Sequence, residues 1–353
     1  MKVQHDQLQQ LIRAIFQGAG CELSEAECVS EHLVKANLVG HDSHGVIRTP
    51  IYVRWLDEGN VYANRKVKVL LENETMVLVD GQLGLGQSVG QQAMNLGIEK
   101  CQKHGVAIVA LRNSGHLGRI GHWAEMAIDA DLVSLNFVNT TGLGMHVVPA
   151  GGVERRLSVN PITVGVPIKG RRPIVLDIAA AATAEGKLKV ARNKGVPVPD
   201  GQILDSEGKP TNDPSDFYGP PSGAILPFGG HKGYGLGLVA ELLAGAITGG
   251  GCSAPGKTRL EQGMLSIVID PLKLQTGDEF FGEVSRYVDF VKTARPAEPN
   301  GEVLLPGEIE QRNQEQRMLQ GIELDDKTWS QIVEVAQKRK VSQSLIDSAA
   351  GNA

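Results

Sequence analysis

The stretch Gly40-His41-Asp42-Ser43-His44-Gly45-Val46-Ile47-Arg48-Thr49-Pro50-Ile51-Tyr52 divides the chain into a helical N-terminal part and a long alternation of strands and helices. Gly40 ends the helical pattern before it, and Asp42 or Ser43 is placed to cap a new helix that runs to about Glu58. The sequence therefore predicts that roughly the first sixty residues are helical.

Three chemically active side chains lie at helical spacing within this stretch. His44, Arg48 and Tyr52 occupy positions i, i+4 and i+8, which share one stripe of a helix. A proton donor, a cation and a hydroxyl then face one space near a helix N-terminus, which favours an anion. The alternative is a capped surface helix whose stripe is only solvated.

After Lys66 the periodicity changes. Short apolar or alternating runs predict strands, and helical patterns separate several of them. The predicted strands are 66–71, 76–80, 106–111, 132–138, 162–167, 173–178 and 264–270. This alternation is typical of an α/β fold with part of its sheet buried on both faces. From about Phe281 the chain is mostly helical again, and we expect its two helical ends to pack together beside the α/β core.

Three parts follow from this pattern: residues 1–65 as the first part of a helical domain, 66–280 as the α/β core, and 281–353 as the second part of the helical domain. Inside the core, residues 195–225 are rich in Pro, Gly and Asp. Because helix and strand patterns resume after them, we expect an ordered excursion or lid rather than a linker.

Composition limits the function classes. The 353 residues carry a net charge of −5 and no basic run, so a nucleic-acid-binding surface is not expected. The four cysteines are scattered without a C-x-x-C pair, which gives no support to a zinc ribbon or a redox dithiol. No ligand spacing such as H-E-x-x-H is present, so a metal site is not expected. No apolar run resembles a signal peptide or a membrane span, so we expect a cytoplasmic chain that has free thiols and does not bind membranes.

Two glycine patterns resemble phosphate loops. The segment 80–90 follows a strand and precedes a helix, but its glycines read G-x-G-x-x-x-G, one residue longer than the dinucleotide fingerprint. The glycines of 233–237 lie inside a helical pattern, where small residues usually mean close helix packing. We interpret the first pattern, with Gly84 and Gly86, as a turn and the second as a packing face.

Other segments place polar or ionisable side chains near the ends of predicted strands and helices. Residues 113–122, with His116 and Gly118, follow a strand and open a helix, at the end of a strand where α/β sites form. Asp177 ends a strand, where it could cap a helix over 179–189 or orient an imidazole. Lys232, next to His231, is a natural ligand for phosphate or carboxylate. Solvated or structural roles are the alternatives for each.

These segments, taken with Asn160-Pro161 and residues 305–308, resemble the malate/L-lactate dehydrogenase family of oxidoreductases in the same order along most of the chain. The resemblance implies a non-Rossmann α/β core with a mixed sheet that binds NAD or NADP, and a homodimer. It implies that His44 is the proton donor, that Ser43 and Asp177 are its relay, and that Arg48 grips the substrate carboxylate. Some members are described instead with the residue that matches His116 as the base.

The same resemblance implies the cofactor contacts. They are His116, Gly118, Asn160, Asp177, Ile178, Ala179, Thr183, His231, Lys232, Pro306, Gly307 and Glu308.

The residues and the resemblance together predict hydride transfer between a nicotinamide and C2 of a small 2-oxo or 2-hydroxy acid. His44 supplies the proton, and Arg48 and Tyr52 bind the substrate. One alternative is an NAD(P)H-dependent reductase of a cyclic imine acid, which needs the same cation and proton donor. The alternative from another class is a non-redox protein that binds an anionic metabolite.

Overall fold

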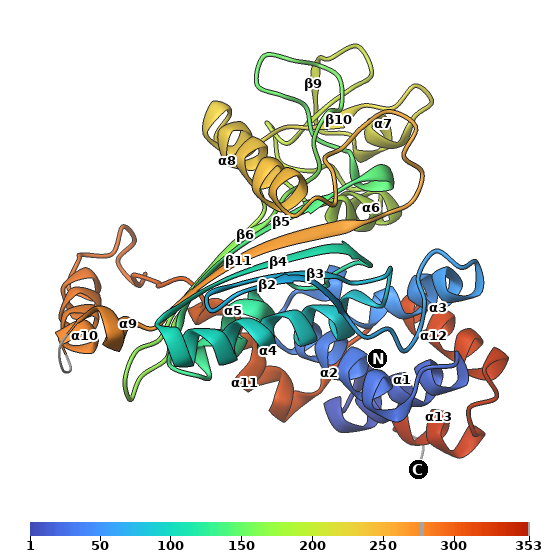
Figure 1. Cartoon of the computed structure of the whole chain (residues 1–353). Coiled ribbons are helices and arrows are strands. Elements are labelled where there is room, and N and C mark those ends of the chain that lie inside the picture. The colour runs from blue at the N-terminus through green and yellow to red at the C-terminus, as the bar shows by residue number, and fades with distance from the viewer. Residues whose placement is uncertain (276–278, 352–353) are drawn as a thin grey trace.

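A mixed seven-stranded sheet forms the centre of the molecule (Figure 1). The computed structural model describes residues 1–275 and 279–351. The strands lie in the order β2 (Lys68–Glu72), β3 (Met76–Asp80), β4 (Val106–Ser114), β11 (Gln262–Ile269), β5 (Val133–Thr140), β6 (Ile162–Val166) and β7 (Ile174–Ile178). Only β3 and β4 run parallel, and every other neighbouring pair is antiparallel. The predicted α/β class with a mixed sheet is confirmed.

Helices α4 (Gly86–His104) and α5 (Gly121–Ile128) cover one face of this sheet (Figure 1). Alternate side chains of β4 explain the packing, since residues i and i+2 of a strand point to the same face. Ala107, Val109 and Leu111 are fully buried in the cluster beneath α4, whereas Val106 and Ile108 on the other face are 38% and 36% exposed. The second face of the sheet is therefore only partly covered.

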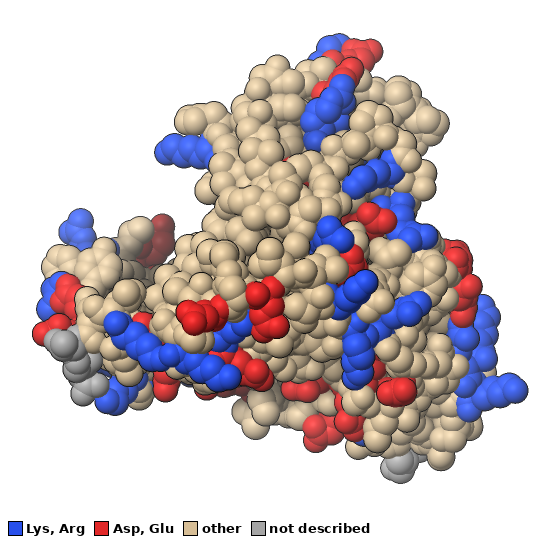
Figure 2. All heavy atoms as spheres, in the orientation of Figure 1, with Lys and Arg blue, Asp and Glu red and all other residues tan. Residues whose placement is uncertain are grey.

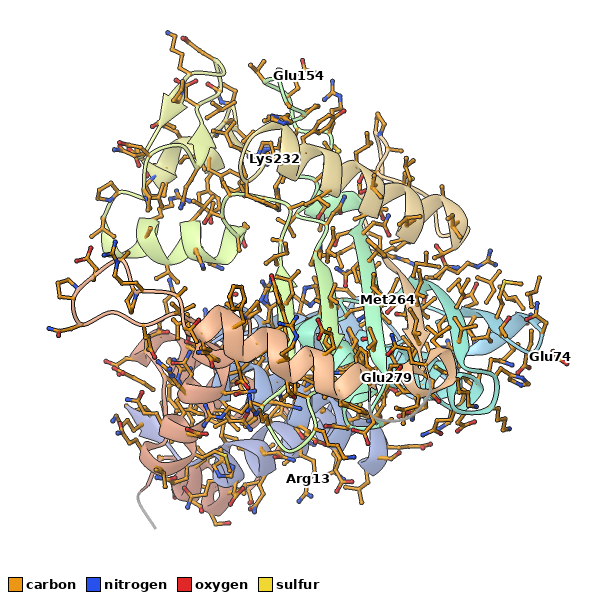
Figure 3. The ribbon with its side chains drawn as sticks, turned by 90° about the vertical axis from the view of Figure 1, so that its left-hand side faces the viewer. Arg13, Glu74, Glu154, Lys232, Met264 and Glu279 are labelled. Carbon is orange, nitrogen blue, oxygen red and sulfur yellow. The ribbon has the colours of Figure 1, made fainter. Side chains whose placement is uncertain are left out.

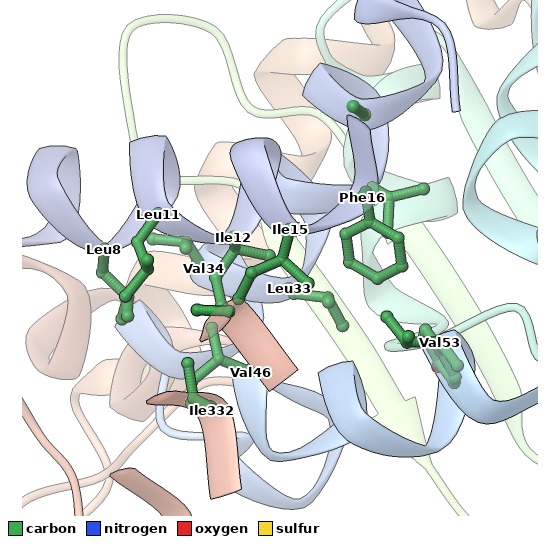
Figure 4. Close-up of a cluster of buried hydrophobic side chains, with 14 of the residues drawn as sticks. Leu8, Leu11, Ile12, Ile15, Phe16, Leu33, Val34, Val46, Val53 and Ile332 are labelled. Carbon is green, nitrogen blue, oxygen red and sulfur yellow. The ribbon is translucent and has the colours of Figure 1, made fainter. Parts of the chain in front are cut away.

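The two ends of the chain share one apolar core, as the sequence predicts (Figure 4). Leu8, Leu11, Ile12 and Ile15 form the buried stripe of the first helix and pack in one cluster with Ile332 near the other end. The helices around this cluster are α1 (His5–Gly18), α2 (Leu23–Leu38), α3 (Thr49–Asp57), α12 (Asp326–Lys338) and α13 (Gln343–Ala349). The short strands β1 (Lys2–Val3) and β12 (Ile322–Glu323) also pair the ends directly.

Two C-terminal helices lie outside that cluster. Helix α11 (Glu308–Gln320) contacts α2, whereas α10 (Glu279–Lys292), together with the short α9 (Pro271–Leu274), lies at the far end of the sheet in Figure 1. The sequence predicts 281–353 as one part of the helical domain, but in the structure α10 lies apart from α11, α12 and α13. The three domain boundaries stay a prediction.

Residues 195–225 form an ordered lobe above the sheet (Figure 1). A small sheet of β8 (Ile203–Leu204), β9 (Pro210–Thr211) and β10 (Ala224–Ile225) packs with α6 (Glu185–Lys194) and α7 (Pro214–Tyr218). Helix α8 (His231–Glu241) follows and continues as a π-helical segment, Leu242–Ile247. None of the helices in the described ranges is both long and apolar enough to cross a bilayer.

Candidate active site

The central stretch 40–52 is not the single helix that the sequence predicts. It forms two 3-10 turns, η1 (Asp42–His44) and η2 (Val46–Arg48), before α3 begins at Thr49. The cause is a contact from α2: the Asn37 side chain accepts a hydrogen bond from Val46 N at 2.7 Å. Gly45 adopts extended backbone there, and a Cβ on it would lie 2.1 Å from Asn37 Oδ1. The prediction that His44 and Arg48 lie one turn apart on a single helix was therefore wrong. The two side chains nevertheless lie near each other, since the charge of Arg48 lowers the pKa of His44.

Two stacked histidines form the centre of the candidate site. The rings of His44 and His116 lie 5.6 Å apart with an angle of 18° between their planes. Ser43 Oγ lies 3.0 Å from His44 Nδ1, and the role of this contact in a relay stays a prediction. Burial, followed by the charge of Arg48, lowers the pKa of His44 to about 3 and the pKa of His116 well below its ordinary value. Both imidazoles are thus neutral near pH 7 in the ligand-free protein.

Arg48 presents a guanidinium edge beside these rings. Its Nε donates to Ser43 O at 2.6 Å, which fixes the plane of the guanidinium against η1. No residue in the described ranges accepts a hydrogen bond from its Nη1 or Nη2. A planar cation with two donors free matches the two oxygens of a carboxylate.

Tyr52 is buried against His116, whereas the sequence predicted that it faces an open space together with Arg48. Only 1% of the tyrosine is exposed, and its hydroxyl lies 2.5 Å from His116 Nδ1. Gln87, on the first turn of α4, donates from Nε2 to the Tyr52 hydroxyl at 3.3 Å and to His116 O at 3.1 Å. Burial raises the pKa of Tyr52 to about 12, so the hydroxyl keeps its proton. Direct contact between Tyr52 and substrate stays a prediction.

Asp177 makes neither of the two contacts expected from its position in the sequence. It cannot cap a helix at 179, because the next helix, α6, begins at Glu185. Its Oδ2 accepts a hydrogen bond from Gly121 N at 2.9 Å, at the start of α5. Burial raises the pKa of Asp177, and the charges of Arg119 and His41 oppose that rise. The relay from Asp177 to Ser43 is thus not formed by a direct hydrogen bond in the described residues.

The segments predicted to hold the cofactor lie together around the edge strand β7. Val175 N donates to Pro306 O at 3.1 Å, which brings 306–308 alongside the strand. After the strand, Ala180 O accepts from Phe228 N at 3.1 Å, and a Cβ on Gly233 would lie 2.8 Å from that oxygen. The loop 178–183 and the start of α8 are therefore in contact.

The side chains of these segments around β7 differ in exposure. His231 and Lys232 are exposed at the start of α8, and Figure 3 shows Lys232 at that end of the helix. Thr183 is buried, while Ile178 and Ala179 are half-buried. The Glu308 carboxylate already has two partners: its Oε2 accepts from Leu305 N at 2.9 Å and from Lys292 Nζ, at the end of α10, at 2.5 Å.

Asn160 lies against α8, whereas Gly118 lies on the other side of the site, against α2. Asn160 is fully buried with a φ of 36°, and its Nδ2 donates to Gly237 O and Glu241 Oε2. Its Oδ1 is buried with no hydrogen-bond partner in the described residues. Gly118, at φ 72°, packs against α2, since a Cβ there would lie 2.3 Å from His32 Nε2.

The glycines of 80–90 serve close packing. A Cβ on Gly86 would lie 2.2 Å from His116 O, and a Cβ on Gly84 would lie 2.6 Å from Val89 Cγ1. β3, α4 and β4 do form a parallel βαβ unit, but the start of α4 is packed against the backbone of 115–116. This backbone occupies the place that a phosphate takes at a dinucleotide-binding loop, which supports the interpretation as a turn.

Sequence reasoning missed a buried ionic cluster beside the site. Arg119 is 2% exposed and pairs with Glu125 at 2.6 Å, and Lys35 of α2 pairs with the same carboxylate at 2.8 Å. His32 Nε2 accepts from Arg119 N at 3.0 Å and so anchors the loop after His116. Arg119 was visible in the motif 113–122, but nothing in the sequence distinguishes a buried ion pair from a ligand. In the described ranges no group of three or more His, Cys, Asp or Glu side chains could hold a metal ion.

Comparison with known proteins shows the family to which the chain belongs. The family model described as malate/L-lactate dehydrogenase matches residues 3–333. The chain belongs to the malate/L-lactate dehydrogenase family. It is 40% identical to hydroxycarboxylate dehydrogenase B of Escherichia coli (strain K12) over 336 residues, which cover 94% of this chain and 92% of that protein.

Solved structures of this family have the same fold. The structure of an E. coli protein assigned as a malate/lactate dehydrogenase matches with a TM-score of 0.94 at 37% identity and covers 99% of both chains. Delta1-piperideine-2-carboxylate reductase from Pseudomonas syringae pvar. tomato matches with a TM-score of 0.81 at 32% identity, over 95% of this chain and 99% of that one. A member of this dehydrogenase family is an enzyme, so the non-redox binding protein loses its support.

Proposed function

We propose that the protein is an NAD(P)-dependent oxidoreductase that interconverts 2-oxo acids and 2-hydroxy acids. One observation carries the proposal: the free guanidinium edge of Arg48 lies beside two neutral imidazoles, His44 and His116. A carboxylate held by two parallel hydrogen bonds to Arg48 brings its neighbouring C2 oxygen toward these rings.

His44 is the proposed acid and base. Its neutral form takes the hydroxyl proton when a 2-hydroxy acid is oxidised, and Ser43 holds Nδ1 at 3.0 Å so that Nε2 faces the ligand. A bound carboxylate offsets the charge of Arg48, which is the second cause of the lowered pKa of His44. Substrate binding therefore raises the pKa of His44 and makes the imidazolium accessible for the reverse reaction.

Ser43 and Asp177 are proposed as positioning residues. Ser43 acts on His44 directly, whereas Asp177 fixes the start of α5 through Gly121 N at 2.9 Å. That start follows directly on the loop that carries His116, so the carboxylate sets the position of the second imidazole through the backbone. Asp177 thus supports the site from the β7 side.

The residues around β7 fit a nicotinamide dinucleotide. Gly235 on α8 has no atom within 4 Å of the position of its missing Cβ, and the exposed Lys232 at the start of the helix supplies a cation where the helix favours phosphate. The unpartnered, buried Oδ1 of Asn160 is an acceptor suited to an amide N–H. When bound, the nicotinamide supplies or accepts the hydride. The other proposed contacts are His116, Gly118, Asp177, Thr183 and 306–308, and the proposal leaves NAD and NADP open.

The experiment is a panel of 2-oxo acids assayed with NADH and with NADPH, following oxidation of the reduced nicotinamide. We expect turnover with at least one 2-oxo acid, and a strongly reduced but measurable kcat/KM in Arg48→Gln with unchanged NAD(P)H binding. Absence of turnover with every acid and both cofactors would contradict the proposal.

A second candidate function rests on one structural neighbour. A protein named delta1-piperideine-2-carboxylate reductase shares this fold over 95% of the chain at 32% identity. A cyclic imine acid presents a carboxylate to Arg48 and a nitrogen, in place of an oxygen, to His44. Cyclic imine acids therefore belong in the same panel, and a kcat/KM for them above that of every 2-oxo acid would favour this candidate.

We also propose that the protein is a homodimer. Apolar side chains along α8 and the π-helical segment are exposed without a covering element: Val239 is 48%, Leu242 49% and Ile247 60% exposed. Figure 2 shows few charged residues over α8 and the sheet edge below it. Figure 3 looks onto that side, with α8 above the strands and α10 below. An exposed apolar surface of this kind usually marks a protein–protein contact.

Light scattering tests the assembly. We expect a dimer for the native chain and a monomer for Ile247→Glu, because a buried unpaired carboxylate at an interface is costly. The exposed Lys209 in the upper lobe provides the control variant Lys209→Glu, which keeps the native mass. A monomeric native chain would refute the homodimer.

A further inference from the structure

The strongest unexplained feature is the chain of hydrogen bonds on the buried side of His116. Two groups approach its Nδ1: the Tyr52 hydroxyl at 2.5 Å and Gly118 N at 3.3 Å. Gln87 closes the chain by contacting both the Tyr52 hydroxyl and His116 O. The proposed reaction gives no role to these hydrogen bonds among Tyr52, Gln87 and His116.

The direction of each hydrogen bond follows from the donors present. His116 O can only accept, so the Gln87 atom that contacts it, 3.1 Å away, is the amide nitrogen. The same nitrogen donates to the Tyr52 oxygen at 3.3 Å, which leaves the Tyr52 proton to point elsewhere. The nearest acceptor for that proton is His116 Nδ1. Gly118 N–H can only donate and approaches the same atom, so Nδ1 receives hydrogen bonds and carries no proton.

The other ring nitrogen faces the opposite way. His116 Nε2 has no hydrogen-bond partner in the described residues, and it is not among the buried unpartnered atoms. The charged and titratable groups that face the ring are Arg48, His44 and His32, from η2, η1 and α2, and Tyr52. The positive charge of Arg48 disfavours a second proton on His116, while the two buried histidines and the tyrosine are neutral. The ring is therefore a neutral imidazole whose Nε2–H is open to a ligand beside His44.

We infer that Tyr52 and Gln87 are positioning residues that hold His116 as the Nε2–H tautomer, so that His116 donates a hydrogen bond to the reacting oxygen while His44 exchanges the proton with it. The inference rests on the proposed function for the identity of that oxygen. In the reduction the carbonyl oxygen gains negative charge as hydride arrives at C2, and a fixed neutral donor stabilises this charge without losing its own proton. The two histidines thus have different roles, set by their partners: Ser43 for one, and Tyr52 with Gln87 for the other.

Nitrogen NMR of the full-length chain labelled with ¹⁵N-histidine tests the tautomer without substrate. The signal of His116 among the nine histidines is identified by its loss in His116→Asn. We expect Nδ1 to resonate as an unprotonated nitrogen and Nε2 as a protonated one, with no change across neutral pH. In Tyr52→Phe the stronger donor is lost, and a population with the proton on Nδ1 becomes measurable.

A second variant, a control and a kinetic measurement keep the test decisive. Gln87→Met interrupts the chain one bond further away and should produce the same change if Tyr52→Phe does not fold. Tyr62→Phe removes the hydroxyl of a tyrosine that is 39% exposed and should leave the spectrum and turnover unchanged. In kinetics, Tyr52→Phe should lower kcat about 10-fold with the NAD(P)H Kd unchanged, because one hydrogen bond to the reacting oxygen is weakened.

The outcomes separate this inference from the proposed function. A native His116 protonated on Nδ1, or a Tyr52→Phe spectrum identical to the native one, overturns the inference even if the enzyme reduces 2-oxo acids. Failure of every 2-oxo acid and cyclic imine as a substrate contradicts the proposed function, while the tautomer of the ligand-free protein can still be measured.

Discussion

Replacing Arg48 by lysine keeps a positive charge but removes the planar guanidinium that the proposed two-point binding of the substrate carboxylate requires. The native Nε donates to Ser43 O at 2.6 Å, and Nη1 and Nη2 remain available for a ligand. A lysine ammonium is a point charge on a flexible stem and cannot serve Ser43 and two carboxylate oxygens together. We therefore expect the Lys variant to hold the substrate through fewer hydrogen bonds and in a less defined orientation.

The magnitude follows from the bonds lost. One hydrogen bond to a charged group contributes about 1.5–3 kcal/mol, and about 1.4 kcal/mol corresponds to a tenfold change in rate. Arg48→Lys should thus lower kcat/KM for the 2-oxo acid by roughly 10- to 150-fold. Its NAD(P)H Kd, measured by fluorescence, should stay native, because Arg48 is not among the proposed cofactor contacts.

A neutral variant separates charge from geometry. Burial and then Arg48 lower the pKa of His44 to about 3, so Arg48→Gln should raise it toward the ordinary value of about 6.5. The base must be neutral to accept the hydroxyl proton, so activity is lost as the pH falls through this pKa. In the oxidation direction, kcat/KM of Arg48→Gln should therefore decline on the acid side at a higher pH than in the native enzyme or Arg48→Lys. Two results would refute the binding of the substrate carboxylate by Arg48: a native kcat/KM in Arg48→Lys, or a decline of kcat/KM in Arg48→Gln at the same acidic pH as in the native enzyme.

Three further substitutions test other parts of the site. His44→Ala should lower kcat and kcat/KM together by roughly 10²- to 10⁴-fold, the usual contribution of general acid–base catalysis, and a loss below tenfold in steady-state assays would count against His44 as the acid. Lys232→Ala should raise the NAD(P)H Kd about 5-fold or more by removing an exposed cation at the start of α8; binding equal to that of the control Lys209→Ala would place the phosphates elsewhere. Gly86→Ala should lower the free energy of unfolding by about 1–3 kcal/mol in urea titrations, because its Cβ would lie 2.2 Å from His116 O; Gly282→Ala in α10 has nothing within 4 Å of the new Cβ and should not be destabilising.

Local periodicity predicted most of the fold but not the order of its strands. The stripe of the first helix and the run Met76–Asp80 could be predicted because their side chains face one core at a fixed period. The place of β11 between β4 and β5 could not, since it depends on pairing residues over 100 positions apart, such as Gln262 with Thr140. The break at Gly45 likewise depends on Asn37 of another helix, which no local pattern contains.

The candidate site shows the same limit. The sequence could propose His44 and Arg48 because an imidazole and a guanidinium close together in a glycine-bounded stretch have few structural uses. It placed Tyr52 with them as a substrate contact, but the tyrosine hydroxyl contacts His116, 64 residues away, and spacing alone could not show this contact. Gln87 carried no signal at all, because a buried glutamine amide resembles any other polar residue of an amphipathic helix until its acceptors are known.

Glycine patterns show why spacing alone cannot assign a phosphate site. A phosphate loop and a close backbone contact both require the absence of a Cβ, so both produce the same letters in the sequence. At Gly86 the space is taken by His116 O, 2.2 Å from the missing Cβ, whereas at Gly235 on α8 no atom lies within 4 Å. What the missing side chain would have met therefore decides the function of each glycine. Gly233, whose Cβ would lie 2.2 Å from Phe228 O, serves close packing as Gly86 does, whereas Gly235 leaves space at the helix surface that a dinucleotide could approach.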